Sequence, residues 1–193
     1  MLDSLTGKVV FITGSARRVG RGIALGFARA GAHVVIHHSS SPDDAEQTAA
    51  EARALGVDAL IVQGDHADES AIARNFAQVQ AHFGRLDVMV NSASIFRQTP
   101  LLDIPLDEWD AVLDINLRAP FLCTQHAGRI MRASAIAGSI INIADTSGLR
   151  PWARRPHHSV SKAGLIMLTE VTAAARAQYQ IRANALVLGP VLP

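Results

Sequence analysis

The chain has 193 residues, of which 49% are hydrophobic and 18% charged, a composition that predicts a globular domain with a substantial core. Its formal net charge of +1 excludes a bulk electrostatic attraction to nucleic acid or to an anionic membrane, so we expect neither as a partner. The single cysteine, Cys123, excludes an intrachain disulfide, and the N-terminal segment lacks a signal-peptide pattern, so we expect a cytoplasmic protein. The scattered histidines match no zinc-ligand spacing, and no metal site is expected.

Apolar segments of strand length alternate along the chain with segments of helical period. The predicted strands are residues 8–13, 33–37, 58–63, 86–91, 139–144 and 182–188. Their apolar residues are continuous rather than alternating, which is typical of strands that are covered on both faces. The alternation predicts an α/β fold: a doubly wound parallel sheet flanked by helices, in a single domain that spans residues 1–193.

Two of the intervening helices have recognisable ends. A capping-box-like start at Ser41, with Pro42 in the first helical position, predicts a helix that runs to Leu55. Asp68 is expected to cap the next helix, and Gly84 to end it.

The first strand runs into a glycine-containing turn that begins at Thr13 and precedes a helix. Such a turn lets backbone N–H groups approach a pyrophosphate at the positive end of the helix. We therefore predict that Thr13, Gly14, Val19 and Gly20 bind a dinucleotide cofactor. The alternative is that Gly14 is an ordinary turn glycine.

The residues near the end of the second strand indicate which cofactor is bound. An NAD site commonly places an acid there to bind the ribose 2′-hydroxyl. This chain instead has His38, Ser39 and Ser40, while Arg17 and Arg18 on the turn can hold a 2′-phosphate. We therefore predict NADP(H), although solvated loop arginines and serines that merely precede a helix are the alternative.

This turn resembles that of the short-chain dehydrogenase/reductase family, Thr-Gly-x-x-x-Gly-x-Gly. Thr13, Gly14 and Gly20 match it, and Arg18 replaces the middle glycine, as in the pteridine reductase branch. The resemblance implies a Rossmann-type fold, and it implies that the family's last helix and strand are missing here. It also implies further cofactor-binding residues along the chain: Asp65, His66, Asn91, Ser92, Ala93, Lys162, Gly189 and Pro190.

The resemblance also implies a catalytic set. In this family a serine orients the substrate, a tyrosine transfers the proton, a lysine four residues later supports the tyrosine and the ribose, and an asparagine extends a proton relay. Here Asp145 stands at the serine position, as in pteridine reductases, and His158 stands at the tyrosine position. Lys162 shares a helix face with residue 158, and Asn116 matches the asparagine.

The histidine changes the proton chemistry, since tyrosine titrates near ~10 and histidine near ~6.5. A Lys162 cation would disfavour imidazolium, whereas a nearby Asp145 would favour it. Tyr179 is expected far along the same helix as His158, too far to replace it. Three alternatives stay open: His158 acts as the acid, Asp145 carries the proton transfer, or the protein binds its cofactor without useful turnover.

The substrate site is expected near the nicotinamide. Phe96 resembles the phenylalanine that stacks on the pterin in pteridine reductases, and a loop phenylalanine packed on the core is the alternative. With Ser94, Asp145 and Trp152 it forms the predicted substrate site. The branch implies an NADPH-dependent reductase of a pterin or another small carbonyl or imine compound, in a homo-oligomer (dimer or tetramer). A general 3-oxoacyl or carbonyl reductase and a regulatory NADP(H)-binding protein are the alternatives.

Overall fold

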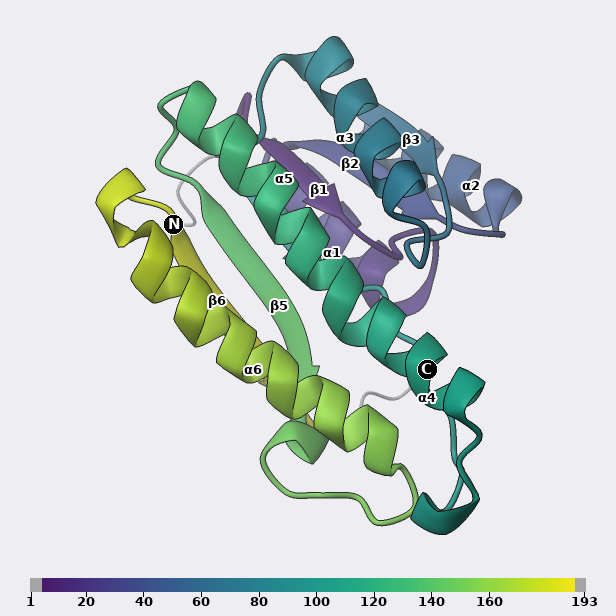
Figure 1. The fold of residues 1–193 in the computed structure, drawn as a ribbon. Helices are drawn as coiled ribbons and strands as arrows, with labels where there is room; N and C mark the ends of the chain where they lie inside the picture. Colours follow the sequence, from purple (N-terminus) through teal and green to yellow (C-terminus); the bar gives the residue numbers. More distant parts are fainter. Residues whose placement is uncertain (1–4, 190–193) are drawn as a thin grey trace.

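The computed structural model describes residues 5–189, and it has a single parallel sheet between layers of helices (Figure 1). The strands are β1 (Val9–Ile12), β2 (His33–His38), β3 (Ala59–Gln63), β4 (Val88–Asn91), β5 (Ser139–Asp145) and β6 (Arg182–Leu188). Their order is β3-β2-β1-β4-β5-β6, and every neighbouring pair is parallel. This confirms the predicted doubly wound sheet, whose strand order reverses between β1 and β4.

The helices connect successive strands, as right-handed crossovers require. They are α1 (Arg18–Arg29), α2 (Pro42–Ala54), α3 (Glu69–Phe83), α4 (Leu106–Leu113), α5 (Ala119–Ala133) and α6 (Pro156–Arg176). A π-helical segment, Asp114–Arg118, joins α4 to α5, and short 3-10 turns lie at Leu101–Asp103, Thr146–Gly148 and Ala177–Tyr179. Tyr179 therefore lies in a separate turn beyond α6 and not on that helix.

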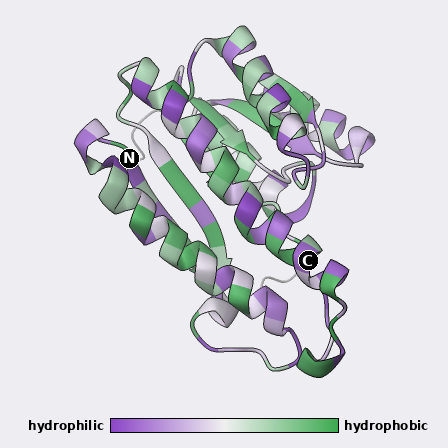
Figure 2. Ribbon diagram, in the orientation of Figure 1, coloured by the Kyte–Doolittle hydropathy of each residue, from purple (hydrophilic) through white to green (hydrophobic). Residues whose placement is uncertain are grey.

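The strands β1, β2, β4 and β5 are buried along most of their length, which explains their continuous apolar residues. The edge strand β6 differs: it has no buried residue, and its Leu186 and Val187 are exposed. In β1, Val10 and Ile12 belong to a core shared with α1 and α2, whereas Val9 and Phe11 belong to a core shared with α3 and α5. Figure 1 shows α5 and α6 in front of the sheet and α1 behind it. The strands are hydrophobic along most of their length (Figure 2).

The predicted ends of α3 and the predicted bounds of α2 are confirmed, but the capping bond expected at the start of α2 does not form. Asp68 Oδ1 accepts the N–H of Ser70 at 2.8 Å, and Gly84 ends α3 in the left-handed region with φ of 67°. Ser41 makes no side-chain cap bond at the start of α2. Its backbone N–H instead donates to His38 Nδ1 at 3.2 Å, because the histidine at the end of β2 lies within reach.

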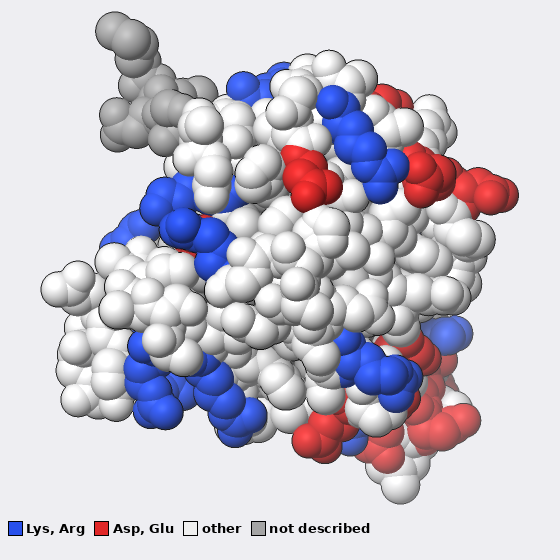
Figure 3. Space-filling view, turned by 90° about the horizontal axis from the view of Figure 1, so that it is seen from above, with Lys and Arg blue, Asp and Glu red and all other residues white. Residues whose placement is uncertain are grey.

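The described part of the chain has charged groups on its surface, and it has neither a membrane-spanning helix nor a metal-ligand cluster. On the face seen in Figure 3, Lys and Arg occur in several separate groups with uncharged surface between them, and Asp and Glu lie mostly toward the right of the view. Across residues 5–189, no helix combines the length and the apolar character that crossing a bilayer requires. The same part of the chain contains no cluster of three or more His, Cys, Asp or Glu side chains suited to a metal ion.

Candidate active site

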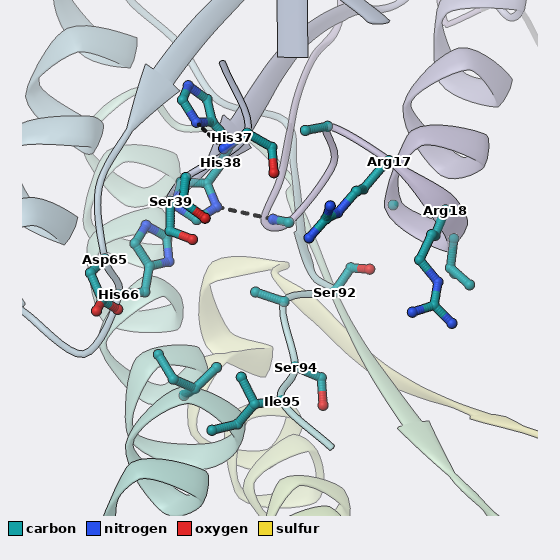
Figure 4. Close-up of a pocket in the computed structure, with 18 of the residues that line it drawn as sticks. Arg17, Arg18, His37, His38, Ser39, Asp65, His66, Ser92, Ser94 and Ile95 are labelled. Carbon is teal, nitrogen blue, oxygen red and sulfur yellow. Dashed lines mark hydrogen bonds between the residues drawn. The ribbon is translucent and has the colours of Figure 1, made fainter. Parts of the chain in front are cut away.

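A cavity of about 650 Å³ lies where the strand order reverses, at the carboxyl ends of β1 to β4 (Figure 4). The predicted cofactor residues that line it are Gly14, Arg17, Arg18, Val19, Gly20, His38, Ser39, Ser40, Asp65, His66, Ser92 and Ala93. Ser94, predicted for the substrate, lines it too. The loops after four separate strands are thus brought together around one space.

Glycine is required at two positions of the turn after β1. Gly14 has φ of 63°, and a Cβ there would lie 3.0 Å from Ala93 Cα. A Cβ on Gly20 would collide with the carbonyl oxygen of Gly14. Thr13 Oγ1 accepts the N–H groups of Ser92 and Ala93, both at 2.9 Å, and so ties this turn to the loop after β4. The close backbone approach leaves the turn facing the cavity.

The first turn of α1 is suited to an anion. Its N-cap, Arg17, makes no side-chain cap bond, and no acidic residue lies in the first turn. The first backbone N–H groups of a helix have no intrahelical acceptor and attract negative charge. Arg18 itself adopts the left-handed region, with φ of 55°, at the position where the family turn has a glycine.

The cavity wall carries both cationic and acidic side chains. Figure 4 shows Arg17 and Arg18 on one side of the cavity and Ser39 and Asp65 across from them. The guanidinium of Arg17 has a long contact, 4.0 Å, to the exposed carboxylate of Asp44. No carboxylate lies in the segment His38 to Ser41 at the end of β2.

Asp145 and His158 form a close pair where β5 ends and α6 begins. His158 Nε2 lies 2.7 Å from Asp145 Oδ2, and Asp145 Oδ1 accepts both the N–H and the Oγ–H of Ser147. Partial burial raises the pKa of Asp145, but the hydrogen bonds from His158 and Ser147 outweigh it and lower the pKa to about 2. The carboxylate is therefore ionised at neutral pH.

Asn116 presents its amide NH2 group to His158. Its Oδ1 accepts the backbone N–H of Ile95 at 2.9 Å, and its Nδ2 donates to the Ile95 carbonyl at 3.0 Å, so the amide cannot be flipped. Nδ2 also faces His158 Nδ1 at 3.4 Å, shared with Ser161 Oγ at 3.2 Å. Nδ1 can thus accept from this amide, and in that tautomer the Nε2–H of His158 donates to Asp145.

Lys162 lies on the same face of α6 as His158, one turn later. Its Nζ donates to the carbonyl oxygen of Ile143 at 2.8 Å, and the residue is only 4% exposed. Burial lowers the pKa of Lys162, while the negative charge of Asp145 acts in the opposite direction. In this structure the ammonium group thus contacts β5 and does not line the cavity.

The predicted substrate residues close over His158. The Phe96 ring meets the imidazole edge-on at 4.7 Å, and the Trp152 ring lies nearly parallel to it at 6.3 Å. Arg155 Cζ lies 3.6 Å from the centre of the Phe96 ring, and its guanidinium donates to Gln98 Oε1 at 2.9 Å. His158 is only 2% exposed beneath this cover. We call the contact of Arg155 with Phe96 and Gln98 the arginine clasp.

Some predicted cofactor residues lie outside the cavity. Thr13, Asn91, Lys162 and Gly189 do not line it, and Pro190 lies outside the described residues. Asn91 Nδ2 instead donates to Asn142 Oδ1 at 2.7 Å, across the β4–β5 pair. Further lining residues were not predicted: Ala16, His37, Ser41, Ala67, Ile95, Ala111 and Ile115. Of these, only His37 gave a signal, as a polar residue in an apolar strand.

A second polar pair also escaped prediction. His157 is completely buried, and its Nε2 lies 3.0 Å from Glu108 Oε1, which also accepts the hydroxyl of Thr99. The pair ties the loop after β4 and helix α4 to the start of α6. It thereby supports the segment that carries His158.

Comparisons with known proteins agree with this geometry. A family model described as short chain dehydrogenase matches residues 8–193. The chain is 34% identical over 188 residues to a 3-oxoacyl-[acyl-carrier-protein] reductase from a Synechocystis species, which covers 97% of this chain and 76% of that protein. A short-chain type dehydrogenase/reductase from Mycobacterium marinum is similar in structure, with a TM-score of 0.91 and 32% identity over 96% of this chain and 76% of that one. A short chain dehydrogenase from Burkholderia cenocepacia, in complex with NADP, has a TM-score of 0.89 and 34% identity over 95% of this chain and 74% of that one.

Proposed function

We propose, from the premise that this chain belongs to the short chain dehydrogenase family, that it is an NADP(H)-dependent oxidoreductase of small carbonyl or imine compounds. The observation that carries the proposal is the grouping of Asn116, Asp145 and His158, which is joined to the cavity through the contact of Asn116 with Ile95. A nicotinamide cofactor bound there would supply the hydride. The chain's own residues would hold it, position the substrate and supply the proton.

The preference for NADP(H) is supported by the two arginines and by the missing acid at the end of β2. Arg17 and Arg18 are the cations of the cavity wall, and a guanidinium binds a phosphate through paired hydrogen bonds. Ser39 and Ser40 add hydroxyl donors on the opposite wall. We expect these four residues to select the 2′-phosphate.

The proton supply is the weak step of the proposed reaction. The transferable hydrogen nearest the substrate side is the one that His158 Nε2 donates to Asp145, and a neutral imidazole is a poor proton donor. Asp145 is ionised at neutral pH, so it has no proton of its own to give. Because neither His158 nor Asp145 is a good proton donor, we expect slow turnover. Lys162 would add positive charge beside the ribose of the cofactor and beside the Asp145–His158 pair.

A second candidate function is a protein that binds NADP(H) without useful turnover. It is favoured by the engagement of both ring nitrogens of His158 and by its 2% exposure under Phe96 and Trp152. A substrate atom reaches this imidazole only if the covering loops move apart.

Two substrate classes are compatible with the proposal. Arg18, Asp145 and Phe96 match the pteridine reductase branch and favour a pterin, although Arg155 occupies one face of the Phe96 ring in this structure. The Synechocystis relative is a 3-oxoacyl-[acyl-carrier-protein] reductase, which favours a 3-oxoacyl compound. Both are carbonyl or imine compounds that accept a hydride and a proton.

We also propose a homo-oligomer. Phe121 on α5 and Val160, Met167 and Val171 on α6 are large apolar side chains that are at least 43% exposed. Burying them against a second copy would remove apolar surface from water. Light scattering of the purified protein tests this, and a monomer at micromolar concentration would contradict it.

The test of the function begins with binding of NADPH and NADH, followed by thermal shift and by tryptophan fluorescence. Tight binding of NADPH with much weaker binding of NADH is the expected result, and binding of neither cofactor by a folded protein would refute the cofactor proposal. Turnover of a dihydropterin and of a 3-oxoacyl thioester then separates the substrate classes. Binding without turnover of either substrate favours the second candidate.

A further inference from the structure

His37 is a buried polar residue in an apolar strand, and both its backbone and its side chain contact the phosphate-binding turn. It lies in β2, one residue before the strand ends, is 3% exposed and lines the cavity. Its backbone carbonyl accepts the N–H of Ser15 at 2.9 Å, and its own N–H donates to Ser15 Oγ at 3.0 Å. The main chain of His37 is thus joined to the phosphate-binding turn on both sides.

The imidazole adds a second connection to the same turn. Nδ1 accepts the backbone N–H of Gly14 at 3.0 Å, and Nε2 lies 2.9 Å from the carbonyl oxygen of Gly64 (Figure 4 shows the ring beside the turn). A carbonyl only accepts, so Nε2 carries the hydrogen and Nδ1 is free to accept. One neutral tautomer therefore satisfies both contacts, and it joins the turn after β1 to the loop after β3.

The surroundings keep this ring neutral and in place. The His66 ring stacks on it with a centroid separation of 3.8 Å and an angle of 24° between the planes. Burial lowers the pKa of His37 to about 4, partly offset by the Gly64 carbonyl. A protonated ring would put an N–H against the N–H of Gly14, so the neutral form is the one that the turn requires.

We propose that His37 is a positioning residue, which holds the phosphate-binding turn open for the dinucleotide by accepting the amide of Gly14. Gly14 stands in the left-handed region, and the contact fixes the direction of its N–H toward the His37 ring. The amides at the start of α1 are then left to meet the pyrophosphate. The inference rests on the proposed cofactor site, but its effect on the turn can be measured without cofactor.

Two substitutions separate the two ring contacts. An asparagine oxygen is three bonds from Cα, as Nδ1 is, whereas a glutamine amide nitrogen is four bonds away, as Nε2 is. His37→Asn thus keeps an acceptor for Gly14 and loses the Gly64 contact, and His37→Gln does the reverse. If the His37 ring only filled space, both substitutions would affect the turn equally. His33 on the same strand provides the matched control, because its Nδ1 accepts the N–H of Asp58 at 2.9 Å far from the cavity.

The first readout is hydrogen exchange of the Gly14 amide, measured by NMR without cofactor. We expect protection to persist in His37→Asn and to fall about tenfold in His37→Gln. The second readout is NADPH affinity, which we expect to weaken about tenfold in His37→Gln and to change little in His37→Asn, His33→Asn and His33→Gln.

Equal loss of Gly14 protection in both His37 variants, or none in either, would overturn the positioning role. If His37→Gln does not fold, His37→Asn alone decides: retained protection supports the role, and lost protection contradicts it. If the unsubstituted protein does not bind NADPH, the proposed function fails, while the exchange data still decide whether His37 holds the turn.

Discussion

His158 and Asp145 share one hydrogen across 2.7 Å, at the place where the family has a tyrosine facing a serine. Tyr and Ser are both neutral hydroxyls at pH 7, whereas this pair combines an ionised carboxylate with a neutral imidazole. The carboxylate holds the imidazole hydrogen, and Asn116 occupies the other ring nitrogen. Both ring nitrogens of His158 are thus engaged, so a substrate has to displace one of these contacts before it can take a proton from the imidazole.

Restoring the tyrosine tests this conclusion. We expect His158→Tyr to raise the turnover number about a hundredfold, because a phenol beside Lys162 is a competent acid. The rates are measured with saturating NADPH and the better of the two substrate classes. NADPH affinity should stay the same, which serves as the control, and a fall in turnover would show that the histidine itself is the working acid.

Removing an arginine from the cavity wall tests cofactor selection. Arg17→Gln should weaken NADPH binding about ten- to a hundredfold and leave NADH binding unchanged, because only NADPH carries the 2′-phosphate. Arg21→Gln is the matched control, since Arg21 pairs with Glu51 and does not line the cavity. Equal weakening of both cofactors in Arg17→Gln would contradict a role in selection.

The left-handed conformation of Arg18 predicts an effect on stability. An L-residue other than glycine is strained in this region, so Arg18→Gly should give a protein about 1 kcal/mol more stable than Arg18→Ala. Urea unfolding of the two variants measures the difference. Both variants lose the same charge, so their NADPH affinities provide an internal control. Equal unfolding midpoints would mean that the turn adjusts its backbone to residue 18.

Opening the arginine clasp should expose the residues beneath it. In a Trp109→Phe background, which leaves Trp152 as the reporting tryptophan, Arg155→Gln is expected to increase quenching of the fluorescence by acrylamide. The reason is that the guanidinium lies on Phe96 and bonds Gln98, and so joins the two loops over His158. Arg154→Gln, an exposed neighbour, is the control. Unchanged quenching in Arg155→Gln would show that other contacts hold the loops.

The sequence predicted those features that depend on neighbours in the chain. The turn at Gly14, the cap at Asp68 and the stop at Gly84 each follow from local backbone requirements, and the structure contains all three. The doubly wound parallel sheet follows from the alternation of apolar strands with helices along the chain. The contact of His37 with Gly14 spans 23 residues and depends on how two loops meet, so no local pattern indicates it.

The same reasoning explains what was missed around His158. The resemblance supplied Asp145, His158 and Asn116 but not the direction in which each side chain donates. That direction follows from the Ile95 backbone, which orients the amide of Asn116 from 21 residues away. The arginine clasp likewise joins loops 57 residues apart. Sequence spacing indicates which residues belong to such a site. The packing of distant segments determines how their side chains are oriented and whether a substrate can reach them.

The buried histidines predict how stability depends on pH. Burial lowers the pKa of His66 from 6.5 to about 3, with a further contribution from His37. Below pH 6.5 the unfolded chain binds a proton at this residue that the folded chain does not, so the free energy of unfolding falls as the pH drops from 6.5 toward 3. At about pH 5 the loss is about 2 kcal/mol for this residue.

His66→Gln should therefore reduce the difference in unfolding free energy between about pH 7.5 and about pH 5. Urea unfolding at both pH values, for the variant and the unsubstituted protein, measures the change. Repeating the experiment at high salt is the control, because salt screens exposed charges far more than buried ones. An unchanged pH dependence in His66→Gln would mean that residue 66 takes up its proton equally in both states, and the acid sensitivity would then have to come from the remaining groups.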